Sequence, residues 1–117
     1  MKIYLAGGFY SNWQDSVKQG APQHEYFNPE TDSPQNAIID YVPVDLGGIR
    51  WCDILFARQD NYPKYGGLAA EMGYAYALGK IIIYVAVREE VEGFLAGLSK
   101  YIYTTLEAGI ERLRKWD

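Results

Sequence analysis

Glu71 is the residue whose surroundings in this sequence most clearly suggest chemistry. It is the only charged residue between Lys64 and Lys80, and the residues around it are mostly glycine, alanine, tyrosine and other apolar types. At helical spacing Leu68 and Ala75 fall on the same stripe, so the carboxylate belongs to an apolar helix face. Burying an unpaired carboxylate costs on the order of several kcal/mol, which proteins usually tolerate when the group is paired or reactive. The alternatives to a reactive role are a helix N-cap and an ion pair with a distant arginine.

The elements that must position Glu71 follow from the hydrophobic pattern of the chain. Short apolar runs predict five strands, at residues 2–6, 24–27, 53–57, 81–86 and 101–103. Helices are predicted at about 12–19 after an N-cap at Ser11, at 40–51, around Glu71 up to a C-cap at Gly79, at 89–99, and after a capping box of Thr104 with Glu107. The polar residues 28–36 are predicted to form a mobile loop.

Strand and helix alternate five times in this pattern, which is typical of an α/β fold. We expect a single domain, residues 1–117, with a flavodoxin-like or Rossmann-like three-layer sandwich around a five-stranded parallel sheet of order 2-1-3-4-5. Ligands of such sheets bind beyond the carboxyl ends of the strands, beside the switch point between strands 1 and 3. The loops that reach this point are residues 7–9 and 58–65, with the start of the Glu71 helix close behind.

Composition and charge exclude several classes of function. The 117 residues carry a net charge of −4, whereas a protein that binds nucleic acid needs a basic surface. No apolar run reaches the ~18 residues of a membrane span, and the N-terminus does not resemble a signal peptide. The single cysteine, Cys52, fits a reducing cytoplasm, and the single histidine, His24, has no second ligand at metal-binding spacing. We therefore expect a cytoplasmic protein with no metal, no cofactor, and no nucleic acid or membrane partner.

Gly7, Gly8 and Phe9 are the predicted ligand contacts at the end of the first strand. Glycines let a ligand approach the backbone closely, and an aromatic ring stacks on a planar ring such as a nucleobase. The three-glycine fingerprint of a dinucleotide site is absent. The alternative for Phe9 and for Trp13, four residues later, is that they anchor the first helix in the core.

Aspartates surround the third predicted strand. Asp45 precedes it, Asp53 starts it at the end remote from the ligand, and Asp60 follows it on the ligand side. A structural role is expected for Asp53. Carboxylates beside a nucleophilic Glu71 are what cleavage of a glycosidic bond needs, because one group attacks the anomeric carbon and another handles the proton of the leaving group. A Ser-His-Asp or Cys-His arrangement is not available, since His24 lies on another strand.

Three segments of the sequence resemble the nucleoside 2-deoxyribosyltransferase family, including its related nucleoside and nucleotide N-glycosidases. They are KIYLAGGF at the start, DLGGIRWCDILFA in the middle, and GGLAAEMGYAYALGKIII around Glu71. The resemblance implies a flavodoxin-like subunit that acts on the N-glycosidic bond of a nucleoside or its 5′-monophosphate. It also implies that Glu71 is the nucleophile, that Tyr4 orients it, and that Asp45 contacts the base.

The substrate-binding residues implied by the resemblance lie in the loop after the third strand. The family's sugar-binding aspartate corresponds to Tyr65, and Asp60 is the acidic residue that could take its place. Tyr62 and Lys64 are further candidates, and the Lys64 ammonium could hold a phosphate. The asparagine that a neighbouring subunit contributes in typical transferases has no counterpart, since Asn61 is the last asparagine. Family members form dimers or hexamers, so the resemblance implies a homo-oligomer.

Two functions from different classes fit these expectations. The first is an enzyme that cleaves or transfers the N-glycosidic bond through a covalent glycosyl-glutamate intermediate. The second is a non-catalytic nucleotide-binding or sensing module on the same fold, because a fold does not fix a function. Glu71 discriminates between them, since a binding module has little reason to keep a costly carboxylate on an apolar stripe.

Overall fold

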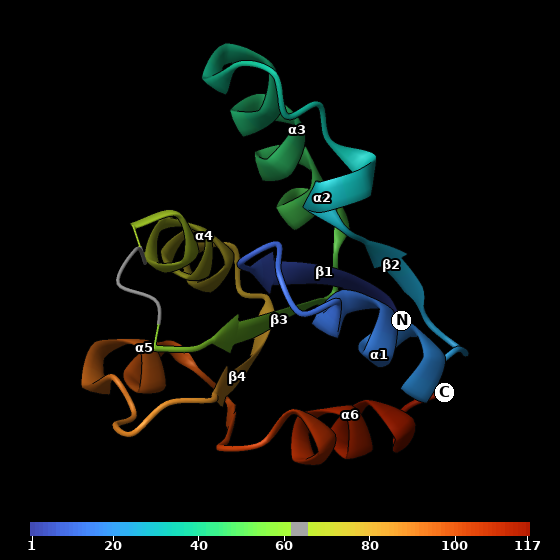
Figure 1. Ribbon diagram of the computed structural model, residues 1–117, viewed down its shortest axis with the longest axis vertical. Coiled ribbons are helices and arrows are strands. Elements are labelled where there is room, and N and C mark those ends of the chain that lie inside the picture. Colours follow the sequence, from blue (N-terminus) through green and yellow to red (C-terminus); the bar gives the residue numbers. More distant parts are fainter. Residues whose placement is uncertain (62–65) are drawn as a thin grey trace.

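A computed structural model describes residues 1–61 and 66–117 and confirms the predicted α/β fold. All five strands are parallel, in the order β2-β1-β3-β4-β5 (Figure 1). The strands are β1 (Lys2–Gly7), β2 (Glu25–Phe27), β3 (Ile54–Gln59), β4 (Ile81–Ala86) and β5 (Tyr101–Tyr103). The helices are α1 (Trp13–Gly20), α2 (Pro29–Asp32), α3 (Ile38–Trp51), α4 (Gly66–Ala77), α5 (Gly93–Leu98) and α6 (Leu106–Arg114). This order places the switch point between β1 and β3.

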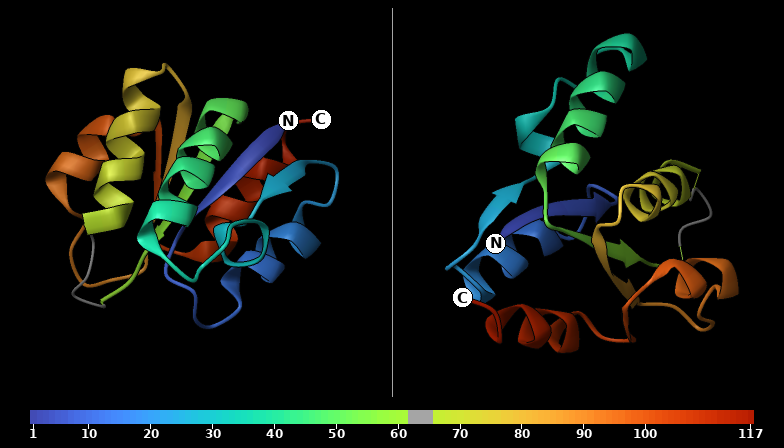
Figure 2. Two further views of the ribbon diagram at one scale, coloured as in Figure 1. Left: turned by 90° about the horizontal axis from the view of Figure 1, so that it is seen from above. Right: turned by 180° about the vertical axis from the view of Figure 1, so that it is seen from behind.

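Helices cover both faces of the sheet and bury two separate hydrophobic cores. On one face α3, α4 and α5 pack against strand residues that include Tyr4 and Leu55. On the other face α1 and α6 pack against Ile3, Leu5 and Phe56 (Figures 1 and 2). Neighbouring residues of one strand alternate between the two cores, so β1 and β3 are buried on both faces. This double burial explains why the central strands read as continuous apolar runs in the sequence.

The register of β1 and β3 brings the ends of these two strands together. Gly7, the last residue of β1, pairs with Arg58 of β3. Gly7 has a φ of +149°, and a Cβ atom there would lie only 2.6 Å from the Arg58 carbonyl oxygen. Glycine is therefore required at this position. Because the chain passes so close to the end of β3, the loop after β1 lies directly beside the residues that follow Arg58.

Residues 28–36, predicted as a loop, contain the short helix α2. The side-chain oxygen of Asn28 caps this helix and accepts a hydrogen bond from Glu30 N at 3.1 Å. In return, the Asn28 backbone N–H donates to Asp32 Oδ2 at 2.8 Å. The loop prediction was wrong for residues 29–32, because asparagine followed by proline is also a favourable way to start a helix, whereas residues 33–36 are irregular as predicted. The mobility of the segment stays a prediction.

The start of α1 differs from the prediction. Asn12, not Ser11, is the N-cap residue, and no side-chain hydrogen bond caps the helix. Asn12 and Ser11 have φ values of 52° and 69°, so the chain turns sharply before the helix begins. The Trp13 indole and the Gln14 amide both donate to the carbonyl oxygen of Gly8, at 2.8 and 2.9 Å. These two bonds fasten the loop after β1 to the first turn of α1.

The last two helices also start later than predicted. α5 begins at Gly93 rather than Glu89, and the Glu92 side chain caps it by accepting a backbone hydrogen bond at 2.8 Å. α6 is capped by Thr105 rather than Thr104. The shift from Thr104 to Thr105 exchanges one favourable capping residue for its neighbour, which sequence patterns resolve poorly.

Candidate functional site

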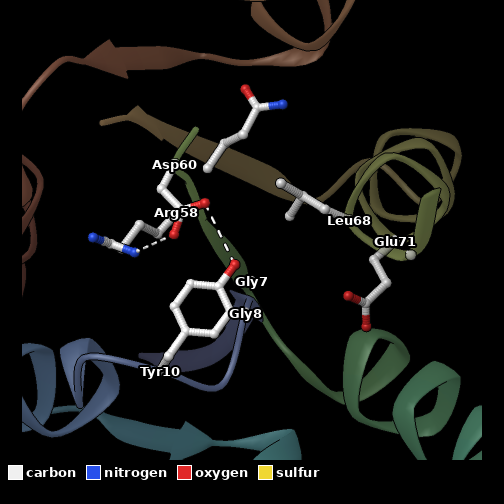
Figure 3. A pocket seen from close by; sticks show the side chains of 9 residues that line it. Gly7, Gly8, Tyr10, Arg58, Asp60, Leu68 and Glu71 are labelled. Atoms are coloured by element: carbon white, nitrogen blue, oxygen red, sulfur yellow. Dashed lines mark hydrogen bonds and ion pairs between the residues drawn. The ribbon is translucent and has the colours of Figure 1, made fainter. Parts of the chain in front are cut away.

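A pocket opens at the carboxyl ends of β1 and β3, where this fold places its ligands (Figure 3). We call it the edge pocket, and its volume is about 200 Å³. It is lined by Gly7, Gly8, Tyr10, Arg58, Gln59, Asp60, Gly67, Leu68 and Glu71. These residues come from the end of β1 and the loop after it, the end of β3 and the residue after it, and the first half of α4. The pocket thus combines exposed backbone with two carboxylates and one guanidinium group, a polar set suited to orienting a small ligand.

Asp60 lies at one side of the edge pocket and contacts Arg58 and Tyr10 (Figure 3). Arg58 Nη1 lies 3.3 Å from Asp60 Oδ2, and the Tyr10 hydroxyl donates to Asp60 Oδ1 at 3.4 Å. The Arg58 and Asp60 side chains are only 14% and 23% exposed, so salt screens this ion pair less than a surface pair. An ionised carboxylate is a pure acceptor, so this side of the pocket is suited to a ligand group that donates, such as a hydroxyl.

A second pocket lies between α3 and α4. We call it the helix pocket; its volume is about 240 Å³. It is lined by Tyr41, Val42, Asp45, Leu46, Gly67, Ala70 and Glu71. Most of these side chains are apolar or aromatic, which suits a planar ring. Asp45 Oδ1 is buried there, with no hydrogen-bond partner among the described residues. Gly67 and Glu71 line both pockets, so the Glu71 carboxylate stands at their boundary.

Tyr4 holds the Glu71 side chain at this boundary. The Tyr4 hydroxyl donates a hydrogen bond to Glu71 Oε2, and the fully buried Tyr4 ring stacks on Phe27 with a centroid distance of 5.4 Å. In Figure 3 the Glu71 side chain extends from α4 toward α3. Glu71 lies in the middle of α4, which excludes the N-cap alternative. No cation among the described residues forms an ion pair with it, which excludes a described arginine as its partner.

Burial shifts the protonation of both carboxyl groups at this site. It raises the pKa of Glu71 to about 7, while the hydrogen bond from Tyr4 lowers that pKa and the charge of Asp45 raises it. Burial also raises the pKa of Asp45, and the nearby Ser33 hydroxyl opposes this shift. The pKa of Tyr4 is raised by burial and by Glu71, so its hydroxyl stays a donor. Adjacent carboxyl groups with shifted pKa values can divide the roles of nucleophile and proton donor.

The structure brings together most of the predicted site residues that it describes. Gly7, Gly8, Asp60 and Glu71 line the edge pocket. Asp45 lines the helix pocket. Phe9 is 41% exposed and lines neither pocket; Tyr10 contributes the aromatic ring of the edge pocket instead. Tyr62, Lys64 and Tyr65 lie outside the described residues. The catalytic and binding roles of all these residues stay predictions.

Arg58 and Gln59 line the edge pocket but were not predicted as ligand contacts. Gln59 is 2% exposed; its Oε1 accepts a hydrogen bond from the Tyr84 hydroxyl, and its Nε2 is buried with no partner among the described residues. The signal that could have found both residues is their position. They are long polar side chains at the ligand end of an otherwise apolar strand.

The remaining candidates from the sequence have structural contacts. His24 Nε2 lies 2.8 Å from the Leu113 carbonyl oxygen, and Cys52 is buried. Asp53 Oδ2 accepts from Lys2 N at 2.9 Å, at the amino ends of the strands and away from both pockets. In the part of the chain that the structure describes, no group of three or more His, Cys, Asp or Glu side chains could hold a metal ion. Within the same residues, every helix is too short or too polar to cross a membrane.

Replacing Tyr4 by phenylalanine is expected to raise the pKa of Glu71, because the hydrogen bond that Tyr4 donates favours the ionised carboxylate. If Glu71 reacts as a carboxylate, the acid limb of a pH–kcat/KM profile starts near pH 7 and moves upward in Tyr4→Phe. Activity then falls more at pH 6 than at pH 9. Tyr26→Phe is the matched control, since the Tyr26 hydroxyl donates to Ala21 O, away from the site. A uniform loss at every pH would contradict the pKa argument.

No family model matches the sequence, and no curated protein matches it either. Solved structures, in contrast, match the fold over nearly its whole length. A 2-deoxyribosyltransferase from Bacillus psychrosaccharolyticus has a TM-score of 0.77 and 21% identity, covering 100% of this chain and 93% of its own. A 2-deoxyribosyltransferase from Leishmania mexicana has a TM-score of 0.72 and 19% identity, with 97% of each chain covered. A CMP N-glycosidase from Clostridium botulinum has a TM-score of 0.69 and 20% identity, covering 99% of this chain and 100% of its own. The chain therefore has the fold shared by 2-deoxyribosyltransferases and a CMP N-glycosidase, as its sequence resemblance predicted.

Proposed function

We propose that the protein cleaves or transfers the N-glycosidic bond of a nucleoside or its 5′-monophosphate, with Glu71 as the nucleophile. The observation that carries this proposal is the position of the Glu71 carboxylate, on the boundary of two pockets and hydrogen-bonded to the buried Tyr4. The names of the proteins with the same fold, two 2-deoxyribosyltransferases and a CMP N-glycosidase, support the same type of reaction.

The two pockets fit the two parts of a nucleoside. Each pocket alone, at about 200 and 240 Å³, is smaller than the roughly 300–1,000 Å³ of typical small-molecule sites. Because the two pockets meet at Glu71, their combined volume falls within that range. A sugar in the polar edge pocket beside Asp60, and a base in the apolar helix pocket beside Asp45, would put the bond between sugar and base next to the Glu71 carboxylate.

The proposed reaction has two displacement steps. Since Glu71 Oε2 accepts from Tyr4, Oε1 is the oxygen that attacks C1′ of the sugar. The new C1′–O bond forms as the C1′–N bond breaks, and the electron pair leaves with the base. The base takes a proton from the Asp45 carboxyl group or from a water that Asp45 orients. Water or a nitrogen of a second base then attacks C1′, breaks its bond to Glu71 and restores the carboxylate. The attacking group gives its proton to Asp45, directly or through a water, which restores the Asp45 carboxyl group.

Asp45→Asn is expected to lower the rate of base release by about 10²–10⁴-fold, the usual contribution of general acid catalysis. The loss should be much smaller with a 7-methylpurine nucleoside, whose base already carries a positive charge and leaves without a proton. Asp40→Asn is the matched control, because Asp40 is an exposed aspartate on the same helix. Equal losses for both substrates would show that Asp45 acts in binding rather than in proton transfer.

The proposed function is tested with a panel of nucleosides and nucleoside 5′-monophosphates, each incubated with and without a second base. Base release from at least one substrate is expected, together with a mass increase on the Glu71 peptide equal to the glycosyl group after a rapid acid quench. New nucleoside identifies a transferase, and free sugar identifies a hydrolase. Binding without base release across the panel would favour the non-catalytic binding module.

A cytoplasmic homo-oligomer, a dimer or hexamer, is part of the same proposal. Ile38 and Ile39 at the start of α3 are 71% and 81% exposed, close in sequence to the residues of the helix pocket. Large apolar side chains grouped on a surface often mark protein contacts, which supports an interface beside the site.

A further inference from the structure

Tyr10 lies at one side of the edge pocket, where its ring packs over Gly8 (Figure 3). A Cβ atom on Gly8 would lie 2.4 Å from Cζ of the Tyr10 ring, so the ring packs directly over the Gly8 backbone and a larger residue there would displace it. The next two residues, Ser11 and Asn12, have φ values of 69° and 52°, a backbone conformation that residues other than glycine rarely adopt. The chain therefore accepts an unfavourable turn that leaves the Tyr10 ring over Gly8.

The contact that this arrangement produces is a hydrogen bond from the Tyr10 hydroxyl to Asp60 Oδ1. At 3.4 Å this bond is long, whereas typical O–H···O bonds measure about 2.7–2.8 Å. Tyr10 is also 43% exposed and belongs to neither hydrophobic core. Arg58 binds the other oxygen, Asp60 Oδ2, and keeps the carboxylate in place when Tyr10 leaves.

We propose that the Tyr10 hydroxyl occupies, in the free protein, the position that a sugar hydroxyl of the substrate takes on Asp60. This inference rests on the proposed function, since it assumes that the edge pocket receives a sugar. Substrate binding then exchanges one hydroxyl donor for another on the same carboxylate oxygen. Tyr10 is a specificity residue in this scheme, because it competes with the substrate and only a ligand that donates to Asp60 displaces it.

The exchange defines which substrates fit. A sugar hydroxyl can donate to Asp60 as Tyr10 does, whereas a fully ionised phosphate ester at the same carbon offers only acceptors. The described residues that line the pocket carry two carboxylates, Asp60 and Glu71, against the single guanidinium of Arg58, which already pairs with Asp60. A phosphate dianion at this position would meet net negative charge. By the charges of its described residues, the edge pocket therefore favours a sugar with a free hydroxyl at the carbon next to Asp60.

If Tyr10 competes with the substrate, removing its hydroxyl should strengthen substrate binding, whereas a tyrosine with a purely structural role would not have this effect. An internal competitor lowers the fraction of protein that is ready to bind, and the apparent Kd rises by the same factor. Tyr10→Phe keeps the ring over Gly8 but removes the hydroxyl. Affinity for the substrate is therefore expected to increase by about two- to fivefold, the lower end of the range for one net hydrogen bond.

The experiment uses the full chain with Glu71→Gln, so that bound nucleoside is not turned over. Kd is measured by calorimetry for deoxyadenosine, deoxyguanosine, deoxycytidine and thymidine and for their 5′-monophosphates, before and after adding Tyr10→Phe. For the nucleoside that binds best, the 3′-deoxy and 5′-deoxy analogues follow. The gain from Tyr10→Phe should disappear with the analogue that lacks the exchanging hydroxyl, and also when Asp60→Ala is present. Tyr26→Phe in the same background is the control and should leave Kd unchanged.

The outcomes separate this inference from the function on which it rests. If neither the four nucleosides nor their 5′-monophosphates bind, the proposed function fails and the inference fails with it. If only the monophosphates bind, the proposed function stands and the inference alone is overturned. If a nucleoside binds but Tyr10→Phe weakens its binding or leaves it unchanged, the inference alone is overturned. A gain that persists with both deoxy analogues, or a 5′-monophosphate that binds tighter than the nucleoside, overturns it as well.

Discussion

Replacing Glu71 by glutamine is expected to reduce base release by about three orders of magnitude or more while the fold stays intact. An amide oxygen does not form the glycosyl ester, so the two-step route closes when the carboxylate is lost. The shape of the site is retained, because the glutamine side-chain oxygen can still accept the hydrogen bond from Tyr4. The measurement is the initial rate of free base formation, with the fold checked by thermal unfolding.

Glu71→Ala adds a sharper test of the same role. Removing the side chain opens space beside C1′, where a small anion such as azide can act as the nucleophile. Azide is then expected to restore base release and to yield a glycosyl azide, which neither wild type nor Glu71→Gln forms. Glu89→Gln is the matched control, since Glu89 is an exposed glutamate away from both pockets. Turnover near the wild-type rate in either Glu71 variant would assign the nucleophile to another residue.

The fold could be predicted because its strongest signals are local. The run Ile81–Ala86 becomes β4 with the predicted bounds, since a strand buried on both faces must be continuously apolar. The alternation of strands and helices then leaves few topologies that obey right-handed crossover, and the observed strand order is among them. The errors lie at helix starts. Asn28 caps the short helix α2, which the pattern did not predict, and Thr105 rather than Thr104 caps α6, because neighbouring polar residues can serve equally well as caps.

The candidate site could be predicted only in part, because its contacts join residues far apart in the chain. Glu71 stood out from its own surroundings, but its link to Tyr4 spans 67 positions and came only from the family resemblance. The contact between Tyr10 and Asp60 spans 50 positions, and no local pattern announces it. It depends on the strand register that sets Gly7 beside Arg58 and on the tight turn after Gly8. Contacts between residues so far apart leave no periodic pattern in the sequence, so they cannot be predicted from it.

The pH dependence of stability is expected to reveal the buried Glu71 carboxylate directly. Its pKa is about 7 in the folded protein against 4.5 when solvated, so the folded state favours the protonated form. The stabilisation from this group is complete below about pH 4.5 and is lost as the pH rises through 7. At pH 9 the folded wild-type protein must hold an ionised carboxylate in a poorly solvated site. The difference between the two pKa values corresponds to a loss of about 3 kcal/mol, since one pKa unit is worth about 1.4 kcal/mol.

Glu71→Gln removes this titration and should be the more stable protein at alkaline pH. The two proteins should have similar free energies of unfolding at pH 4.5, and the variant should gain about 3 kcal/mol by pH 9, or roughly 10 °C in Tm. Chemical denaturation from pH 4.5 to 9, without ligand, measures the difference, and titrations common to both proteins cancel in it. Glu89→Gln should follow the wild type throughout, because an exposed carboxylate loses little solvation on folding. Parallel curves for wild type and Glu71→Gln would mean that Glu71 is solvated, which would remove the physical reason for treating this carboxylate as exceptional.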